Sequence, residues 1–133
     1  MGTKSYKAYI MEGIGTFALC YIGGMSIALS DDDERIIPAL AHMLALGIMI
    51  YVGAATSGGH YNPAVSIALL LTRNMQCKDF PWYIFAQFLG GFLGGLMVWG
   101  LTSGLPDGAD KYCKTYPGIA SMKLRDPNTG DKL

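Results

Sequence analysis

The stretch SGGHYNPAVS, residues 57–66, lies between two apolar segments and decides the fold. Its first half cannot continue a membrane-spanning helix, because a serine, two glycines and a histidine follow in close succession. Pro63 has no backbone N–H and a φ near the helical value, so it suits the first turn of a helix. Asn62, directly before it, is a preferred N-cap residue. The sequence therefore predicts a turn at the glycines and a new helix at Asn62–Pro63.

This new helix is short, because its apolar run ends at Arg73. At ~1.5 Å per residue, residues 62–73 span only about half of a ~30 Å hydrocarbon core. A half-length apolar helix with a capped, polar start places a positive dipole end and free N–H groups inside a bilayer. We therefore expect a re-entrant half-helix.

The composition agrees with a membrane protein. Of the 133 residues, 51% are hydrophobic, only 15% are charged and 18 are glycine. Three apolar runs, at about residues 8–29, 36–56 and 80–101, are long enough to cross a bilayer. The formal net charge of zero gives no reason to expect a nucleic-acid partner. The predicted fold class is thus all-α transmembrane, with the lipid bilayer as its surroundings.

The first apolar run has an alternative interpretation as a signal peptide, since Ala28-Leu29-Ser30 weakly resembles a cleavage site. The run is too long for that role, and it carries Glu12 near its start. We therefore interpret it as a membrane span.

Residues 57–66 resemble the first Asn-Pro-Ala loop of the aquaporin, or major intrinsic protein, family nearly letter for letter. The stretches Glu12–Phe17 and Ala86–Gly91 resemble the family's first-helix and third-helix motifs. The resemblance covers about residues 8–101 and only the first, N-terminal repeat of the two in a complete member. It implies three spans plus one re-entrant half-helix in residues 1–101. Residues 102–133 read as a polar, loop-like or disordered tail.

The resemblance also implies a pore. An asparagine of each Asn-Pro-Ala loop donates a hydrogen bond to a passing water, and backbone carbonyls of the loop form half of a polar track. In this sequence these residues are Asn62, Pro63 and Ala64 of the motif, with Gly58, Gly59 and His60 before it.

Two further polar residues support the loop by resemblance. Glu12 faces the pore interior and holds the loop through hydrogen bonds, the alternative being a carboxylate that reaches the interface. Gln87 makes a buried hydrogen bond between helices.

His42 is the selectivity candidate. It lies twenty residues before Asn62, where the family places the second-helix member of its narrow selectivity ring. The alternative is a histidine whose ring nitrogens make hydrogen bonds between helices.

No constellation in the sequence supports an enzyme, a metal site or a cofactor. Cys20, Cys77 and Cys113 match no metal-ligand spacing and no disulfide framework. The acidic connector at residues 31–34 fits no calcium-loop pattern, so a solvated turn is the simpler interpretation.

Basic residues indicate the orientation. With three crossings and a re-entrant half-helix, one side of the membrane carries Lys4, Lys7, Arg73 and Lys78. By the positive-inside rule, that side, which also holds the N-terminus, is cytoplasmic. Trp82 and Trp99 lie near the two ends of the last span, as interfacial anchors do.

Gly90, Gly91, Gly94 and Gly95 form overlapping small-xxx-small pairs, which predict the close approach of another helix. We interpret this face as one that needs another protein surface. The expected function is a channel subunit for passive transport of water or small neutral solutes, completed by a second half-unit, a homo-oligomer or a larger membrane complex. The alternatives are a non-conducting structural subunit of a larger complex and an inert truncation.

Overall fold

The computed structural model describes residues 5–30 and 36–104, and every regular element in these ranges is helical. The helices are α1 (Tyr6–Leu29), α2 (Ile36–Gly53), α3 (Pro63–Leu71) and α4 (Phe80–Thr102). Helices α1, α2 and α4 are long and apolar enough to cross a membrane. The predicted all-α transmembrane fold class is confirmed. Lys4, the acidic connector, Cys113 and the tail from residue 105 lie outside the described residues.

The helix ends differ from the predicted ones by a few residues. Helix α2 ends at Gly53 instead of residue 56, because the N–H groups of Thr56 and Ser57 both turn back onto the Gly53 carbonyl, each at 2.9 Å. Helix α3 has nine residues and ends at Leu71, and Arg73 beyond it has a positive φ of 59°. Helix α4 continues one residue past 101 to Thr102, whose hydroxyl donates to the Val98 carbonyl.

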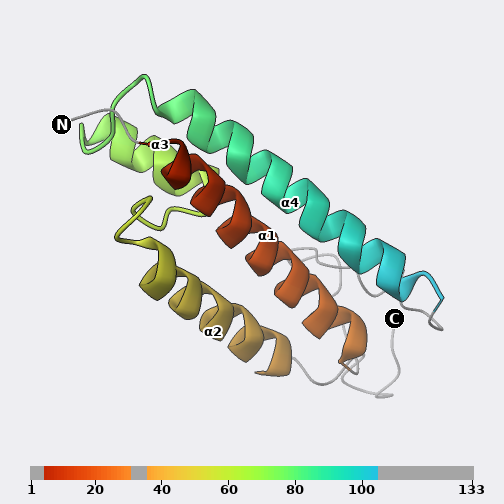
Figure 1. Ribbon diagram of the computed structural model, residues 1–133. Coiled ribbons are helices and arrows are strands. Elements are labelled where there is room, and N and C mark those ends of the chain that lie inside the picture. Colours follow the sequence, from red (N-terminus) through yellow and green to blue (C-terminus); the bar gives the residue numbers. More distant parts are fainter. Residues whose placement is uncertain (1–4, 31–35, 105–133) are drawn as a thin grey trace, which may run out of the picture.

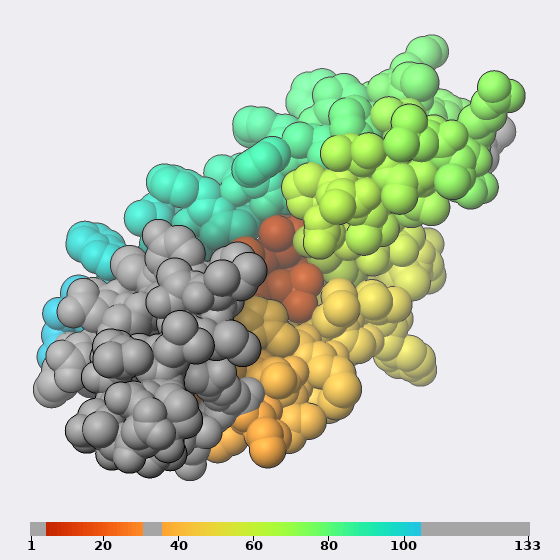
Figure 2. All heavy atoms as spheres, turned by 180° about the vertical axis from the view of Figure 1, so that it is seen from behind, coloured from red at the N-terminus to blue at the C-terminus, as the bar shows by residue number. Residues whose placement is uncertain are grey.

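Helix α1 is the centre of the arrangement: it packs against α2 on one side and α4 on the other, and α3 packs against α4 (Figure 1). Helices α2 and α3 both end on the side where α1 and α4 begin. The segment 54–62 and α3 therefore enter and leave on one side, as a re-entrant segment does. Seen from behind, α1 is visible only between α2 and the paired α3 and α4 (Figure 2).

The contact between α1 and α4 is made by glycines. A Cβ added at Gly90 would overlap the carbonyl oxygen of Gly13, and one at Gly94 would lie 2.8 Å from the carbonyl oxygen of Phe17. The predicted close approach of a helix is therefore confirmed. The interpretation that this glycine face needs another protein surface is wrong, because α1 of the same chain covers it. Small-xxx-small spacing shows how near a helix can come, but not which helix it is.

Candidate functional site: the re-entrant loop and half-helix

The carboxylate of Glu12, on α1, is fully buried and holds the loop with both oxygens. Its Oε1 accepts from the backbone N–H of His60 at 3.0 Å, and its Oε2 accepts from that of Tyr61 at 2.7 Å. The Gln87 amide on α4 also donates to Oε2, at 2.8 Å. Hydrogen bonds to a charged group contribute about 1.5–3 kcal/mol each. One side chain thus joins α1, the loop and α4.

The same amide nitrogen of Gln87 donates to the Ser66 hydroxyl at 2.9 Å, and the Ser66 hydroxyl lies 3.0 Å from Nδ1 of His60. Ser66 is the buried residue of α3, so these contacts fix the half-helix against α4 and the loop. Within the described ranges, Gln87 Oε1 is the single buried side-chain oxygen or nitrogen without a hydrogen-bond partner. Ser66 lies within residues 57–66, but its place in the sequence alone does not indicate this role.

The loop backbone has a left-handed conformation at three positions. Gly58 and Gly59 have φ values of 102° and 67°, which glycine adopts without steric cost. Tyr61 has a φ of 48°, which is unusual for a residue with a side chain. Its N–H bonds Glu12, and its hydroxyl donates to the Met49 carbonyl at 2.8 Å, so both ends of Tyr61 are held.

The Tyr61 ring fills space that two glycines leave open. A Cβ at Gly15 would overlap the ring, and a Cβ at Gly53 would overlap its hydroxyl. Tyr83 of α4 is a second tyrosine at the loop: its hydroxyl donates to the Ser57 carbonyl, and its ring lies 4.8 Å from the His60 ring, between centroids. Neither tyrosine is predicted from the sequence, because each hydroxyl bonds a carbonyl on another segment of the chain.

Asn62 caps α3 as predicted: its Oδ1 accepts from the Ala64 N–H at 2.9 Å. The residue is exposed, and its Nδ2 donates to no group among the described residues. Because Oδ1 is occupied by the cap, the NH₂ group faces away from the helix start as a donor. Pro63 follows at the first helical position.

Next to Asn62, the carbonyl oxygens of Gly58 and Gly59 accept no hydrogen bond from any described residue. Val65 and Ile67 of α3 are 41% and 45% exposed, so this short helix carries accessible apolar side chains. The arrangement therefore offers an exposed donor at Asn62 and two backbone acceptors, whereas the Ser66 hydroxyl beside His60 is fully buried.

His42 lies apart from this cluster, on α2. Its Nδ1 is 3.2 Å from the Pro38 carbonyl oxygen, and its ring occupies the space in front of Gly23 of α1, where a Cβ would overlap it. The side chain is exposed, and no contact with the loop is found among the described residues. Its place in a selectivity ring stays a prediction.

The described residues contain no group of three or more His, Cys, Asp or Glu that could hold a metal ion. Cys20 and Cys77 are both free.

Comparison with known proteins gives the class of this chain. The model of the family described as "Major intrinsic protein" matches residues 2–125, which extends past the 8–101 of the sequence resemblance. The chain is 34% identical over 116 residues to the Glycerol uptake facilitator protein-like 6 of Lactiplantibacillus plantarum, covering 86% of this chain and 53% of that protein. It is 36% identical over 100 residues to human Aquaporin-9 (71% and 34% covered), and 39% identical over 109 residues to the Aquaglyceroporin of Plasmodium falciparum (74% and 42%).

The chain belongs to the major intrinsic protein family, whose members are channels and not enzymes. With its three apolar helices it is an integral membrane protein. It spans between about a third and about a half of the length of these curated relatives.

Proposed function

We propose that residues 5–104 form one half of a channel for the passive transport of water or small neutral solutes. The observation that carries the proposal is the state of Asn62: its oxygen is fixed by the cap of α3, while its NH₂ group is exposed and has no partner among the described residues. The names of the relatives, a glycerol facilitator, an aquaporin and an aquaglyceroporin, support this class of cargo.

In the proposed pore, a solute oxygen accepts a hydrogen bond from Asn62 while solute hydroxyl or water protons are donated to the carbonyls of Gly58 and Gly59. A neutral solute that exchanges hydrogen bonds along such a row needs little net energy to leave water. The apolar side chains of Val65 and Ile67 would limit the number of polar contacts at any position and so keep binding weak enough for release.

Charged solutes meet a different environment. The start of α3 carries the positive end of a helix dipole, and the loop holds it inside the membrane. A cation at Asn62 would face this positive end and would lose its hydration shell, so the half-helix favours neutral cargo. The oxygens of Glu12 accept hydrogen bonds from His60, Tyr61 and Gln87, so they are not available to coordinate a cation.

A second half-unit is part of the proposal. The described residues present their polar row on one side only, and a bilayer penalises unpaired backbone groups by several kcal/mol each. An opposing wall is therefore needed, from the same polypeptide, another copy or a larger complex. The curated relatives, which are two to three times as long as the matched region, support a pore built from more than this half.

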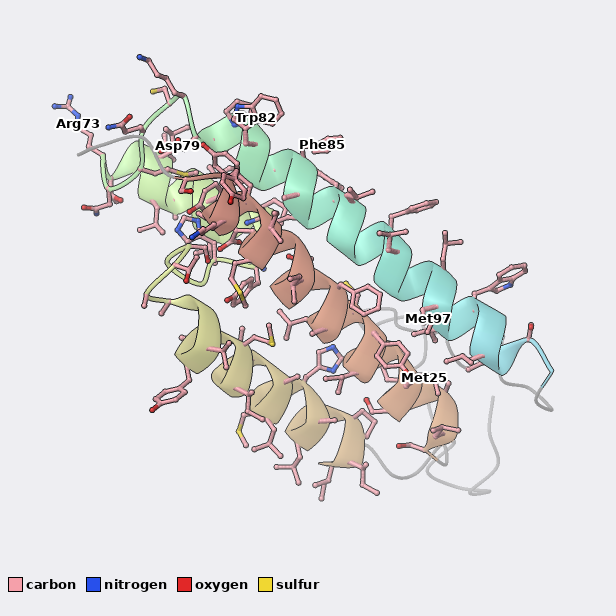
Figure 3. The ribbon with its side chains drawn as sticks, in the orientation of Figure 1. Met25, Arg73, Asp79, Trp82, Phe85 and Met97 are labelled. Atoms are coloured by element: carbon pink, nitrogen blue, oxygen red, sulfur yellow. The ribbon has the colours of Figure 1, made fainter. Side chains whose placement is uncertain are left out.

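Two finer assignments belong to the same proposal. His42 would narrow one mouth of the pore with a polar ring, which its exposed position on α2 permits. Lys7, Arg73 and Lys78 are exposed at the end where α1 and α4 begin and α3 ends (Figure 3 labels Arg73). By the positive-inside rule this end would be cytoplasmic.

The experiment is to purify the chain in mild detergent, measure the mass of the particle, and follow the osmotic shrinkage of liposomes that contain it. We expect oligomers or assemblies with a second half-unit, and shrinkage faster than that of empty liposomes. A stable monomer would contradict the need for an opposing half. Oligomers whose liposomes shrink no faster than empty ones would favour the non-conducting structural subunit instead.

A further inference from the structure

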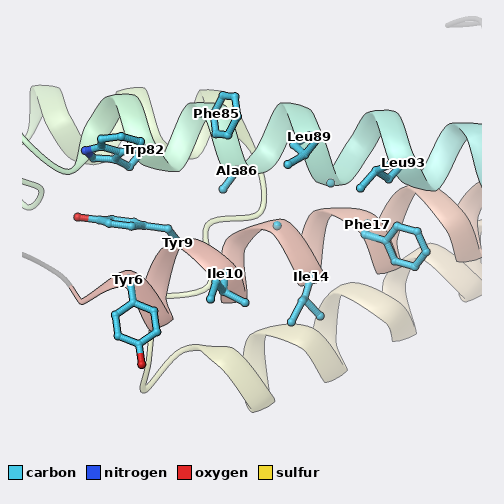
Figure 4. Close-up of a pocket in the computed structure, with 12 residues that line it drawn as sticks. Tyr6, Tyr9, Ile10, Ile14, Phe17, Trp82, Phe85, Ala86, Leu89 and Leu93 are labelled. Carbon is cyan, nitrogen blue, oxygen red and sulfur yellow. The ribbon is translucent and has the colours of Figure 1, made fainter.

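The outer surface of the α1–α4 pair carries an apolar groove of about 500 Å³. This volume lies within the ~300–1,000 Å³ typical of ligand pockets. Tyr6, Ile10 and Ile14 of α1 form one side of it, and Trp82, Phe85 and Leu89 of α4 form the other (Figure 4). Its floor is the glycine contact, where Gly13 and Gly90 bring the two backbones together so closely that the larger side chains stand apart.

The groove faces away from the site. On α1, Glu12 and Gly15 contact the loop and are buried, whereas Ile10 and Ile14 are 56% and 52% exposed. Positions 10 and 14 lie roughly 200° around the helix from position 12. A second half-unit placed against Asn62 would therefore leave the groove uncovered.

The length of the groove matches one leaflet of a bilayer. It runs from Tyr6 to Phe17 on α1 and from Trp82 to Leu93 on α4. At ~1.5 Å per residue each of these stretches is about 16 Å long, roughly half of a ~30 Å hydrocarbon core. The groove is thus as long as an extended acyl chain in a single leaflet.

The two ends of the groove differ in chemistry. At the end where α1 and α4 begin, the rings of Tyr9 and Trp82 stack at 6.2 Å between centroids (Figure 4). The Tyr9 hydroxyl donates to Asp79 at 2.8 Å. Aromatic side chains with a polar tip mark the membrane interface. The opposite end, at Phe17 and Leu93, is purely apolar and lies near the middle of the two spans.

Cations stand beside the aromatic end. Lys7 follows Tyr6, Lys78 precedes Asp79, and both lysines are exposed. Asp79 is the acidic residue at this end, but it is buried and accepts from Tyr9, so it does not face a headgroup. A phosphate placed above the Tyr9–Trp82 pair would therefore meet positive charge.

We propose that this groove is a binding site for one acyl chain of an anionic phospholipid, in the leaflet where α1 and α4 begin. The chain lies over Gly13 and Gly90, between the side chains of α1 and α4. The headgroup lies at the Tyr9–Trp82 pair, within reach of Lys7 and Lys78. This assignment is independent of conduction, since it uses the outer face of the helices.

The two tryptophans of the chain give a matched test. Trp82 lines the groove and Trp99 does not, and both are 57% exposed on α4. W99F leaves Trp82 as the fluorophore, and W82F leaves Trp99. Each variant is placed in phosphatidylcholine vesicles that contain a small fraction of phosphatidylglycerol brominated on one acyl chain, and quenching of fluorescence is measured against that fraction.

We expect the quenching of Trp82 to correspond to a local enrichment of the brominated lipid of at least about fivefold, the factor that one of the two lysines contributes near a membrane surface. Trp99 should follow the bulk fraction. Ile14→Phe, which fills the groove from an exposed position, should remove the excess quenching of Trp82. K7Q with K78Q should reduce the enrichment to about the bulk level.

Three results would overturn the proposal. Trp82 quenched no more steeply than Trp99 would mean that the groove holds lipid no better than the rest of the surface. Trp82 protected from every brominated lipid would mean that a protein surface, such as a second copy, covers it. Equal enrichment of brominated phosphatidylcholine would remove the anionic preference.

Discussion

Helix α1 is attached to its neighbours in two opposite ways. Toward the loop, a single carboxylate, Glu12, accepts all the hydrogen bonds that tie α1 to His60, Tyr61 and Gln87. Toward α4, apart from the hydrogen bond between Glu12 and Gln87, the contact is spread along the glycines Gly13, Gly90 and Gly94. The hydrogen bonds of Glu12 fix the position of the loop backbone, and the glycine contact holds α1 and α4 together. The difference indicates that function and stability can be disturbed separately.

The largest expected effect comes from removing the hydrogen bonds of Glu12. Glu12→Leu leaves the buried N–H groups of His60 and Tyr61 without acceptors, at about 1–3 kcal/mol each. Hydrogen exchange of these two amides should accelerate about a hundredfold, whereas amides in the middle of α1 and α4 should change little. Glu12→Gln, which keeps one acceptor oxygen, should give a smaller acceleration. Unchanged exchange in Glu12→Leu would mean that the carboxylate sits at the interface and does not hold the loop.

Adding a single methyl group to the glycine contact between α1 and α4 should have a smaller effect than Glu12→Leu. In Gly90→Ala the new Cβ meets the backbone of Gly13, which cannot move aside easily, and overpacking of this kind costs about 1–3 kcal/mol. Unfolding in mixed micelles measures the loss. Gly100→Ala on the same helix is the control, because nothing lies within 4 Å of its added Cβ. Equal stability of the two variants would contradict the glycine contact.

The next smaller effect concerns the tyrosine that closes the loop. Tyr61→Phe removes the hydrogen bond from its hydroxyl to the Met49 carbonyl and should cost about 1 kcal/mol. Tyr51→Phe makes the same chemical change at a side chain that is 90% exposed, and we expect no measurable loss there. If both variants unfolded at the same denaturant fraction, the Tyr61 hydroxyl would have no part in holding the loop.

The sequence predicted those features that depend on local chemistry. Asn62 before Pro63 marks the start of α3 because an N-cap and a first-turn proline act within one helical turn. The three spans follow from length and hydropathy alone. A carboxylate in an apolar span, such as Glu12, is costly to bury without a hydrogen-bond partner. This energetic cost and the resemblance to the family's first-helix motif together predict the contact between Glu12 and the loop.

Other features depend on which segments meet in space, and the sequence could not supply them. The glycine spacing of α4 predicts that another helix lies close to it. The spacing is the same whether that helix belongs to the same chain or to another chain. The hydroxyls of Tyr61 and Tyr83 donate to carbonyls 12 and 26 residues away in the sequence, and neither local sequence indicates such a partner. The groove beside Trp82 exists only because α1 and α4 touch at their glycines.

Asn62→Asp tests the central claim most directly, because it should barely change stability. Aspartate also caps a helix, so we expect the free energy of unfolding to stay within about 0.5 kcal/mol. The carboxylate replaces the exposed NH₂ donor with a negative charge at the start of α3. In liposomes whose shrinkage the unaltered chain accelerates, we predict slower passage of water or neutral solute and a measurable cation leak. Identical water and ion permeability in the two proteins would contradict the claim that Asn62 lines a pore.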